Sequence, residues 1–225
     1  WKYMFLVILL ILPVVGLVGS NNLSTAIIIL GIAVILIFVA NPQFLPFLWI
    51  GGTGVGFIGI FLSLESYRLG RLAIWRNPEL YEKGYQTMQG LYAIGSGGLF
   101  GVGLGESMQK LGFVPEAQND MIFSIICEEL GLTGAVAVLV IFGLLIWRLM
   151  VIATWTKDLF GALLAAGVMG HIMIQVILNV AVVTNTIPNT GITLPFVSYG
   201  GTSVVFLLLE MGIALSVSRG VRKEH

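Results

Sequence analysis

The chain of 225 residues is 57% hydrophobic, has a mean hydropathy of +1.00 and carries eleven basic and eleven acidic residues. So much apolar surface has no aqueous core large enough to cover it, which excludes an ordinary soluble domain and predicts a polytopic membrane protein. The neutral charge balance argues against nucleic acid as a partner. One cysteine, Cys127, and two histidines, His171 and His225, argue against disulfides and against a cysteine- or histidine-based metal site.

Apolar runs of about 20 residues, the length that a helix needs to cross a bilayer, predict an all-α fold with about six transmembrane helices. The predicted spans are 4–18, 23–40, 44–64, 130–150, 159–184 and 204–217. Six spans would leave both ends of the chain on one side of the membrane. That side is predicted to be cytoplasmic, because basic residues flank both ends and the loop after the fourth span: Lys2, Arg148, Lys157, Arg219, Arg222 and Lys223.

The chain begins at Trp1, and its first apolar run starts almost at once. We expect one transmembrane domain over residues 1–225 whose earlier spans are missing. A signal peptide is the alternative for the first run, but no separate mature domain follows it. Between the third and fourth spans, residues 65–119 form the longest connection, which we expect to be a large extracytoplasmic loop with a function.

The first part of this connection combines arginines with amphipathic aromatic residues. Arg68 and Arg71 are three residues apart, so a helix would place them on one face beside Tyr67 and Trp75. Planar guanidinium groups bind phosphate or pyrophosphate through two hydrogen bonds, which favours a site for a phosphorylated headgroup. A plain interfacial helix with snorkelling arginines fits the spacing equally well.

A glycine-rich run, AIGSGGLFGVGLG, covers residues 93–105. It has neither the dinucleotide-binding pattern nor the Walker lysine. Gly97, Gly101 and Gly105 at four-residue spacing instead predict close backbone packing in a re-entrant or tightly packed segment.

Acidic residues gather at the start of the fourth apolar run, in PEAQNDMIFSIICEELG (115–131). If this stretch is helical, Glu116, Asp120 and Glu128 share one side and Glu129 points away. A carboxyl group buried beside another carboxylate has a raised pKa and accepts protons better at neutral pH, so one of these acids is a candidate general base. Capping of the helix start is the alternative, and it explains one acid better than three.

Residues 179–203 place polar side chains, two prolines and three glycines between apolar spans. Irregular backbone at membrane depth is tolerated where protein or a wet cavity surrounds it. We therefore expect this segment to line the same outward-facing cavity as Asp120. His171 and Gln175 in the preceding span could also point inward, although a single histidine within a membrane is more often a packing residue.

Three blocks, at residues 84–113, 115–134 and 185–203, together with NNLSTA at 21–26, resemble the SEDS (shape, elongation, division and sporulation) family. The resemblance covers almost the whole chain and is strongest to the FtsW and SpoVE branches, with RodA as a further member. Members of this family have ten spans, so the chain resembles roughly the last six. Many members carry aspartate where this chain has Asn22, and histidine and threonine where it has Gln118 and Asn119.

The resemblance implies a bacterial peptidoglycan glycosyltransferase that polymerises lipid II in the cytoplasmic (inner) membrane, with its active site facing outward. Asp120 matches the family's catalytic aspartate. The positions that the resemblance implies for substrate binding are Arg68, Arg71, Gln86, Glu116, Gln118, Ser198 and Tyr199.

In the implied mechanism, Asp120 takes the proton of the acceptor N-acetylglucosamine 4-hydroxyl as this oxygen attacks C1 of the donor N-acetylmuramic acid with inversion. The sequence leaves open whether arginines or a divalent cation, Mg²⁺ or Mn²⁺, stabilise the polyprenyl pyrophosphate that departs. No other cofactor is predicted. The implied partners are a class B penicillin-binding protein, divisome or sporulation proteins, and membrane lipid. The alternatives are a lipid II flippase and a non-catalytic scaffold for the penicillin-binding protein.

Overall fold

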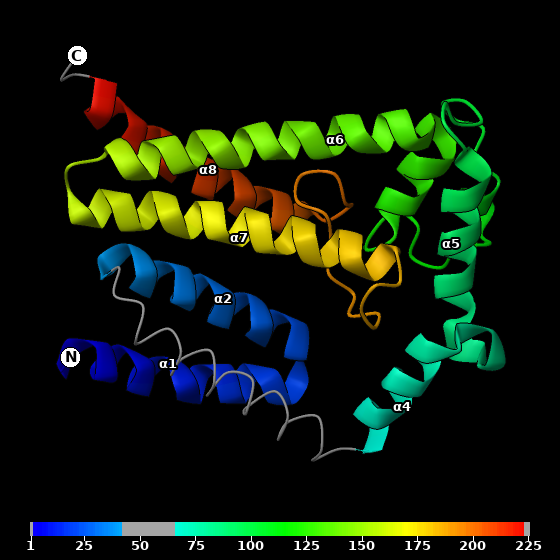
Figure 1. Cartoon of the computed structure of the whole chain (residues 1–225), viewed down its shortest axis with the longest axis horizontal. Helices are drawn as coiled ribbons and strands as arrows, with labels where there is room; N and C mark the ends of the chain where they lie inside the picture. Colours follow the sequence, from blue (N-terminus) through cyan, green and yellow to red (C-terminus); the bar gives the residue numbers. More distant parts are fainter. Residues whose placement is uncertain (1, 42–65, 223–225) are drawn as a thin grey trace. The chain divides into compact units, whose positions relative to one another are not determined.

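The computed structural model describes residues 2–41 and 66–222. In these ranges the regular secondary structure is helical, which confirms the all-α prediction. Short 3₁₀ turns at Pro78–Leu80, Glu82–Gly84 and Gln109–Leu111 accompany the longer helices (Figure 1). These helices are α1 (Lys2–Asn21), α2 (Leu23–Ala40), α4 (Ser66–Arg76), α5 (Tyr85–Gly97), α6 (Ile122–Trp155), α7 (Leu159–Val183) and α8 (Gly201–Arg222).

Four helices in the described ranges are long and apolar enough to cross a membrane: Leu23–Ala40, Ile122–Trp155, Leu159–Val183 and Gly201–Val221. They agree with four of the predicted spans, although α6 begins eight residues before the predicted start at 130. The predicted span 4–18 falls within the 20-residue helix α1. The predicted span 44–64 lies outside the described residues.

The described residues divide into two compact units, and the first contains α1, α2, the Leu145–Ile174 part of α6 and α7, and α8 from Leu208 onward. The Asn22 side chain begins α2, because its Oδ1 accepts a hydrogen bond from the Thr25 amide at 3.2 Å. Asparagine caps a helix about as well as aspartate, so position 22 keeps this role without a charge.

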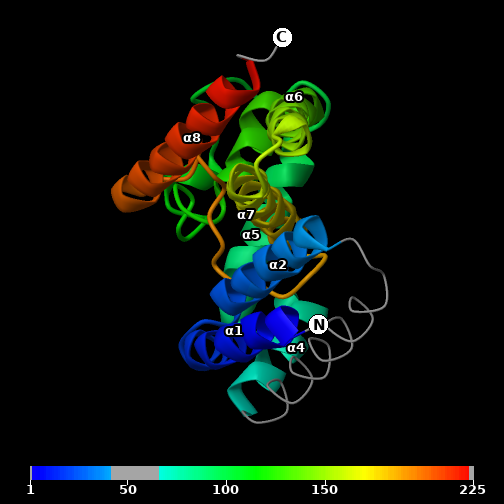
Figure 2. The same ribbon diagram turned by 90° about the vertical axis from the view of Figure 1, so that its left-hand side faces the viewer.

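In this first unit, α7 lies between α2 and α6 (Figures 1 and 2). The core consists of small and branched residues from four helices: Ile152, Ala153, Ala165 and Ala166, with Ile35, Leu36, Val39 and Val217 packed against them. Alanines at this contact let the helix backbones approach closely, which is the usual basis of helix association in lipid.

His171 on α7 pairs with an acid from another helix of the first unit. Its Nδ1 lies 2.9 Å from each carboxylate oxygen of Glu210 on α8. The two polar side chains therefore satisfy each other between apolar helices, where an unpaired ionisable group would be costly. Glu210 was not singled out in the sequence.

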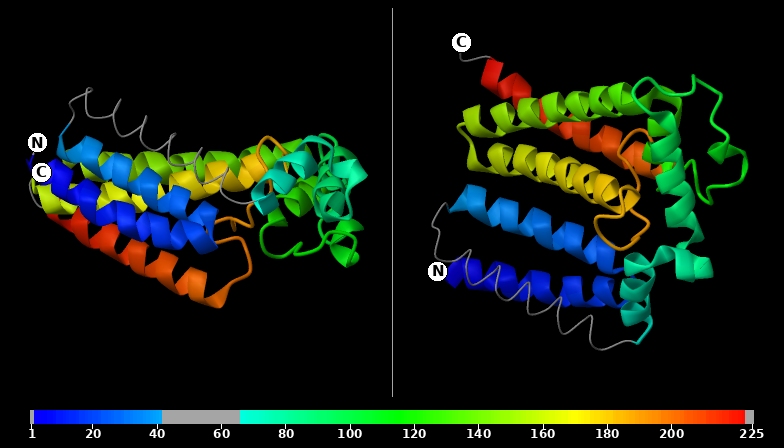
Figure 3. Two further views of the ribbon diagram at one scale, coloured as in Figure 1. Left: turned by 90° about the horizontal axis from the view of Figure 1, so that it is seen from below. Right: turned by 45° about the vertical axis from the view of Figure 1, so that its right-hand side comes forward.

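The second unit contains α4, α5, the loop after α5, α6 up to Leu144, α7 from Gln175 and the segment that follows it up to Leu207. The connection 65–119 is thus largely helical in its first half. Figure 3 shows the segment after α7, drawn in orange, running beside α4 and α5. Trp75 Nε1 on α4 donates to the Asn185 carbonyl at 2.9 Å, so α4 is attached to this segment and is more than a plain interfacial helix.

Helix α6 is interrupted at Gly131, which has φ 67° and ψ −166°. A break of this kind leaves backbone groups on both sides without helical partners. On the N-terminal side of the break, the carbonyls of Glu128 and Glu129 accept hydrogen bonds from the amides of Val102 and Gly103 at 2.9 and 3.0 Å. The loop after α5 therefore supplies the hydrogen bonds that the helix has lost.

The same loop also accepts hydrogen bonds from backbone amides on the C-terminal side of the break. The amides of Leu132 and Thr133 donate to the carbonyls of Gly98 and Leu99 at 2.9 and 3.1 Å. These four backbone bonds attach the glycine-rich run to the first part of α6, which explains how irregular backbone is accommodated there.

Two of the three spaced glycines pack as predicted. A Cβ atom at Gly97 would overlap the carbonyl oxygen of Cys127, and one at Gly101 would overlap that of Glu129. The prediction is wrong for Gly105, whose Cβ position has only the Lys110 side chain nearby, at 4.0 Å. The four-residue spacing does not mark a helix face, because α5 ends at Gly97.

Replacing Gly101 by alanine is expected to destabilise the protein by about 2 kcal/mol or more, since the new Cβ overlaps backbone at a φ of +80°. Thermal unfolding of the purified protein measures this effect. Gly95→Ala on α5 is the matched control, because its Cβ position is open. Equal unfolding temperatures for the two variants would contradict the close packing at Gly101.

Candidate functional site

The segment before α6, residues 115–121, forms turns and not a helix. Glu116 has φ 55°, and the Asn119 amide donates to the Glu116 carbonyl at 2.9 Å. The assumption that Glu116 and Asp120 lie on one helical face is therefore wrong, and α6 begins only at Ile122.

Contacts with the end of α7 and with the segment that follows it explain this departure from helix. Carbonyls that would accept helical hydrogen bonds are taken instead by distant groups. Asn179 Nδ2 donates to the Asp120 carbonyl at 2.8 Å and to the Ile192 carbonyl at 2.7 Å. The Tyr199 amide donates a hydrogen bond to the Gln118 carbonyl at 2.8 Å, and Ser198 Oγ donates one to the Asn119 carbonyl at 2.6 Å. The segment that was predicted to lie beside Asp120 does so.

The Asp120 carboxylate is almost buried, with 8% of the residue exposed. Gln86 Nε2 on α5 donates to it, at 3.2 Å from Oδ1 and 3.4 Å from Oδ2. Gln86 Oε1 in turn accepts a hydrogen bond from Asn189 Nδ2 at 3.3 Å, and the Asn189 carbonyl accepts one from Arg71 Nη1 at 3.3 Å. A continuous chain of hydrogen bonds thus runs from α4 to Asp120.

The environment raises the pKa of Asp120 above its ordinary value. Burial is the main cause, and the nearby negative charge of Glu116 adds to it. Hydrogen bonds from the backbone amides of Asp120 and Met121 and from the Gln86 side chain act in the opposite direction. The result is a carboxylate that accepts a proton more readily than an exposed one.

Asp120 lines a cavity of about 620 Å³. Arg71 and Lys83 bring positive charge to its wall, and Glu82 brings a second carboxylate. The remaining lining residues are Gly70, Ile74, Trp75, Tyr85, Gln86, Thr87, Pro115, Asn185, Asn189, Thr190 and Gly191. The volume and the mixture of aromatic, basic and amide groups suit a polar ligand with a phosphorylated group.

A second cavity of about 480 Å³ shares Pro115 with the first. Glu116, Gln118 and Tyr199 line this second cavity, together with Lys110, Gly112, Val114, Ala117 and Asn119. The structure therefore separates the predicted substrate-binding residues into two groups, with Arg71 and Gln86 beside Asp120 and these three residues in the neighbouring cavity.

Among the predicted site residues with a described side chain, Ser198 lines neither cavity. The Ser198 hydroxyl accepts from the Leu194 amide at 2.7 Å and donates to the Asn119 carbonyl, so it holds the backbone of the site together. Arg68 belongs to the first turn of α4, and its side chain lies outside the described part of the structure.

Sequence reasoning did not single out Asn179, Asn189 or Lys83, although it expected residues 179–203, which include the two asparagines, to line the cavity. Asn179 is a fully buried amide inside an apolar helix, and such a residue signals a specific hydrogen-bonding role. Asn189 and Lys83 carried no comparable signal, because only the fold brings them to the cavity. Within residues 2–41 and 66–222, no three His, Cys, Asp or Glu side chains are grouped as metal ligands.

Comparison with known proteins identifies relatives over nearly the whole chain. The profile of the FtsW, RodA and SpoVE family, described as cell cycle protein, matches residues 1–223. Stage V sporulation protein E of Bacillus subtilis is 43% identical over 218 residues, which cover 92% of this chain and 59% of that protein. A probable peptidoglycan glycosyltransferase FtsW of Trichlorobacter lovleyi is 38% identical over 221 residues, which cover 97% of this chain and 58% of that protein. The chain thus spans about three fifths of the length of these relatives.

Solved structures share the fold. One chain of a peptidoglycan synthase complex that coordinates polymerisation and crosslinking superposes with a TM-score of 0.77 at 30% identity, covering 95% of this chain and 61% of that one. An aspartate-to-alanine variant of Thermus thermophilus RodA gives a TM-score of 0.63 at 30% identity, and the match covers 95% of this chain and 56% of that one. The chain therefore belongs to the FtsW/RodA/SpoVE family of cell cycle proteins, the SEDS family, and is a membrane protein with a RodA-like helical fold.

Proposed function

We propose that this protein is a peptidoglycan glycosyltransferase that polymerises lipid II, with Asp120 as its general base. One observation carries the proposal: a nearly buried aspartate with a raised pKa lines a cavity whose wall also holds Arg71 and Lys83. A base and cations in one cavity are what glycosyl transfer from a pyrophosphate donor requires. Several relatives bear the name peptidoglycan glycosyltransferase, which supports the assignment.

In the reaction, Asp120 removes the proton from the 4-hydroxyl of the acceptor N-acetylglucosamine while this oxygen attacks C1 of the donor N-acetylmuramic acid. The bond from C1 to the pyrophosphate oxygen breaks, and its electron pair leaves with the polyprenyl pyrophosphate. Attack opposite the leaving group inverts C1. Gln86 holds the carboxylate in position, and Arg71 and Lys83 neutralise the charge that develops on the pyrophosphate.

A divalent cation is a second means of neutralising the pyrophosphate. Glu82 and Asp120 are the carboxylates that line the cavity, and one or two carboxylates beside a substrate phosphate are a common ligand set for Mg²⁺. Such an ion would take its other ligands from pyrophosphate and water. We assign the main charge stabilisation to Arg71 and Lys83, because their positive charges line the same cavity and leave Asp120 to act as the base.

We place the protein in the bacterial cytoplasmic membrane, with the site of Asp120 on the outer side. Asp120 precedes α6, and Lys157 follows its end. When α6 spans the membrane, these two residues lie on opposite sides. Basic residues favour the cytoplasmic side, so Lys157 would face the cytoplasm and Asp120 the outside, where lipid II is polymerised.

We propose a class B penicillin-binding protein as the partner that crosslinks the new strands, and divisome or sporulation proteins as regulators. A solved relative is part of a peptidoglycan synthase complex that coordinates polymerisation with crosslinking, and another relative is a sporulation protein.

A lipid II flippase is the rival function, because a polar cavity with basic residues would also suit the transport of a headgroup. To distinguish the two, purified full-length protein in detergent, where no bilayer separates two compartments, is given lipid II and assayed for glycan strands. Strand formation is expected. Failure to form strands, together with movement of lipid II across vesicle membranes, would favour the flippase. If neither strand formation nor translocation is observed, a non-catalytic scaffold is favoured.

The raised pKa of Asp120 predicts how the rate depends on pH. A general base works when ionised, so polymerisation should fall as the pH decreases through this raised pKa. Gln86→Leu removes donors that stabilise the carboxylate, and it should therefore shift the acidic limb of the profile to higher pH. The rate measured against pH tests this. Gln89→Leu on the same helix is the control, and an unchanged limb in Gln86→Leu would contradict the role of Gln86.

A further inference from the structure

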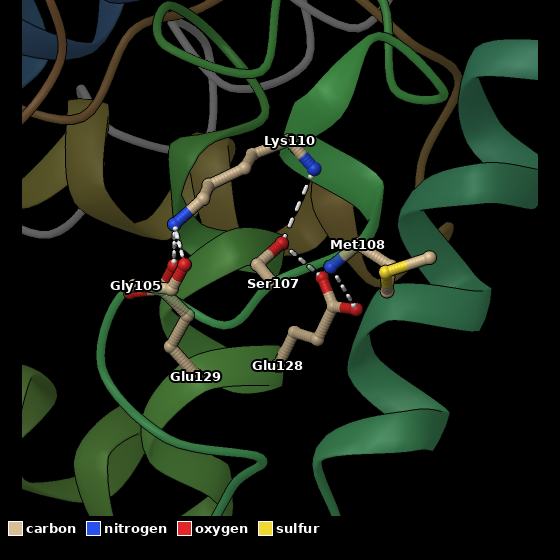
Figure 4. Close-up of polar contacts among 6 residues, drawn as sticks. All are labelled: Gly105, Ser107, Met108, Lys110, Glu128 and Glu129. Atoms are coloured by element: carbon tan, nitrogen blue, oxygen red, sulfur yellow. Dashed lines mark hydrogen bonds and ion pairs between the residues drawn. The ribbon is translucent and has the colours of Figure 1, made fainter.

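Glu128 and Glu129 are two adjacent acids on α6 that the proposed reaction does not use. Glu128 is only 3% exposed, inside the span Ile122–Trp155. Its carboxylate accepts hydrogen bonds from Ser107 Oγ and from the Met108 amide, the latter at 3.2 Å (Figure 4). Both partners are neutral, so burial of this acid in a membrane helix carries a cost that a packing role alone does not repay.

Glu129 contacts the same loop through a cation. Lys110 Nζ lies 2.7 Å from Glu129 Oε1 and 2.5 Å from the Gly105 carbonyl (Figure 4). The Lys110 amide also donates to Ser107 Oγ at 3.2 Å, so the contacts of the two acids are linked. We call the contacts of Glu128 and Glu129 with Gly105, Ser107, Met108 and Lys110 the loop clamp.

The loop clamp joins the two ends of the stretch of chain that carries Asp120, because residues 105–110 precede Asp120 and Glu128 and Glu129 follow it. The chain contacts α6 at the clamp through Ser107 and Met108 and joins the same helix at Ile122, with Asp120 just before the helix begins. Between these points the backbone is held locally by bonds such as that from the Val114 amide to the Gln109 carbonyl at 2.9 Å, and beside Asp120 by the bonds from Tyr199, Ser198 and Asn179 described above. Opening the clamp would release one end of this loop while the other stays fixed to α6.

The clamp also sets the wall of the second cavity. Lys110 lines that cavity together with Glu116 and Gln118, and Pro115 belongs to both cavities. A shift of the loop at Lys110 is therefore transmitted over only a few residues to Pro115 and Asp120. The position of a general base must be kept within a fraction of an ångström for efficient proton transfer.

We propose that Glu128 and Glu129 are positioning residues for the reaction, which fix the loop 105–110 and through it the place of Asp120. This inference rests on the proposed function. Since they act on geometry and not on the binding of lipid II headgroups, their loss should lower kcat much more than it changes KM.

The test uses full-length protein purified with its transpeptidase partner and measures lipid II polymerisation. Glu128→Ala is expected to lower kcat by about 10- to 100-fold, as expected for a displacement of about 1 Å at the reacting group. Glu128→Gln keeps an acceptor for one of the two donors and should lie between Glu128→Ala and the unchanged protein. Glu106→Gln is the matched control, because Glu106 is an exposed acid of the same loop.

A charge exchange covers the case in which Glu128→Ala does not fold. Lys110→Glu and Glu129→Lys each break the ion pair, and each should lower kcat. The double exchange restores a pair of opposite charges, so it should lose less activity than the two single effects combined predict. Thermal unfolding measured on every variant separates displacement of the loop from loss of the fold.

The outcomes distinguish this inference from the proposed function. If Asp120→Asn polymerises normally, the proposed function fails. If Asp120→Asn is inactive but the folded clamp variants keep their kcat, or lose it only in proportion to lost folded protein, the positioning role is wrong. Additive loss in the double exchange would likewise overturn the role of the ion pair.

Discussion

Asp120→Asn is expected to reduce lipid II polymerisation by about 10²- to 10⁴-fold, the usual contribution of a general base. Asparagine has nearly the same shape and still accepts a hydrogen bond from Gln86, but it cannot take the acceptor's proton. Strand formation by the purified full-length protein, measured in a single turnover, would show the loss in the chemical step.

Asp158→Asn provides a control with the same chemical change. Asp158 Oδ2 accepts from the Gly161 amide at 2.8 Å at the start of α7, and asparagine can replace this cap. The control should therefore keep full activity. Normal strand formation by Asp120→Asn would contradict the assignment of the base, and lipid II translocation that survives the change would favour the flippase.

The same substitution has an expected effect on stability. Because the folded-state pKa of Asp120 is raised, its contribution to stability is present below the ordinary pKa and lost as the pH rises through the raised value. At neutral pH the buried charge is a cost, so Asp120→Asn should unfold at the same temperature as the unchanged protein or a higher one. An inactive but stable variant would show that the acid serves the reaction and not the fold.

Arg71→Ala is expected to lower kcat/KM for lipid II by about 10- to 100-fold, since hydrogen bonds to charged groups contribute about 1.5–3 kcal/mol. Arg71 lines the cavity of Asp120 and donates to the Asn189 carbonyl, so it can bind a pyrophosphate from an anchored position. Arg71→Lys keeps the charge but loses the planar fork, and it should have an intermediate effect. Steady-state kinetics with varied lipid II checks both values.

Arg76→Ala is the control for this experiment. Arg76 ends the same helix, is exposed and does not line the cavity. Its replacement should leave kcat/KM unchanged. If Arg71→Ala matches this control, the pyrophosphate is bound elsewhere, and Lys83 would be the next residue to replace.

Much of this protein could be predicted from its residues alone. Hydropathy defines α2, α6, α7 and α8 as apolar helices, because burying about 20 apolar residues in lipid outweighs every local preference. A candidate base among Glu116, Asp120 and Glu128 could be inferred because charge is rare in the chain and acids at the start of an apolar run are costly, and the family resemblance then pointed to Asp120. These features depend on composition over short stretches, which the sequence displays directly.

The arrangement of the site was decided by tertiary structure. The hydrogen bond from Arg71 to Asn189 joins residues 118 positions apart, and that from Asn179 to Asp120 joins residues 59 apart. Such contacts replaced the helix that local periodicity predicted around Glu116. The break at Gly131 was likewise invisible, because its cost is offset only by backbone groups of the distant loop after α5. Hydropathy and helical period therefore determined which segments enter the membrane, and long-range hydrogen bonds determined which side chains meet Asp120.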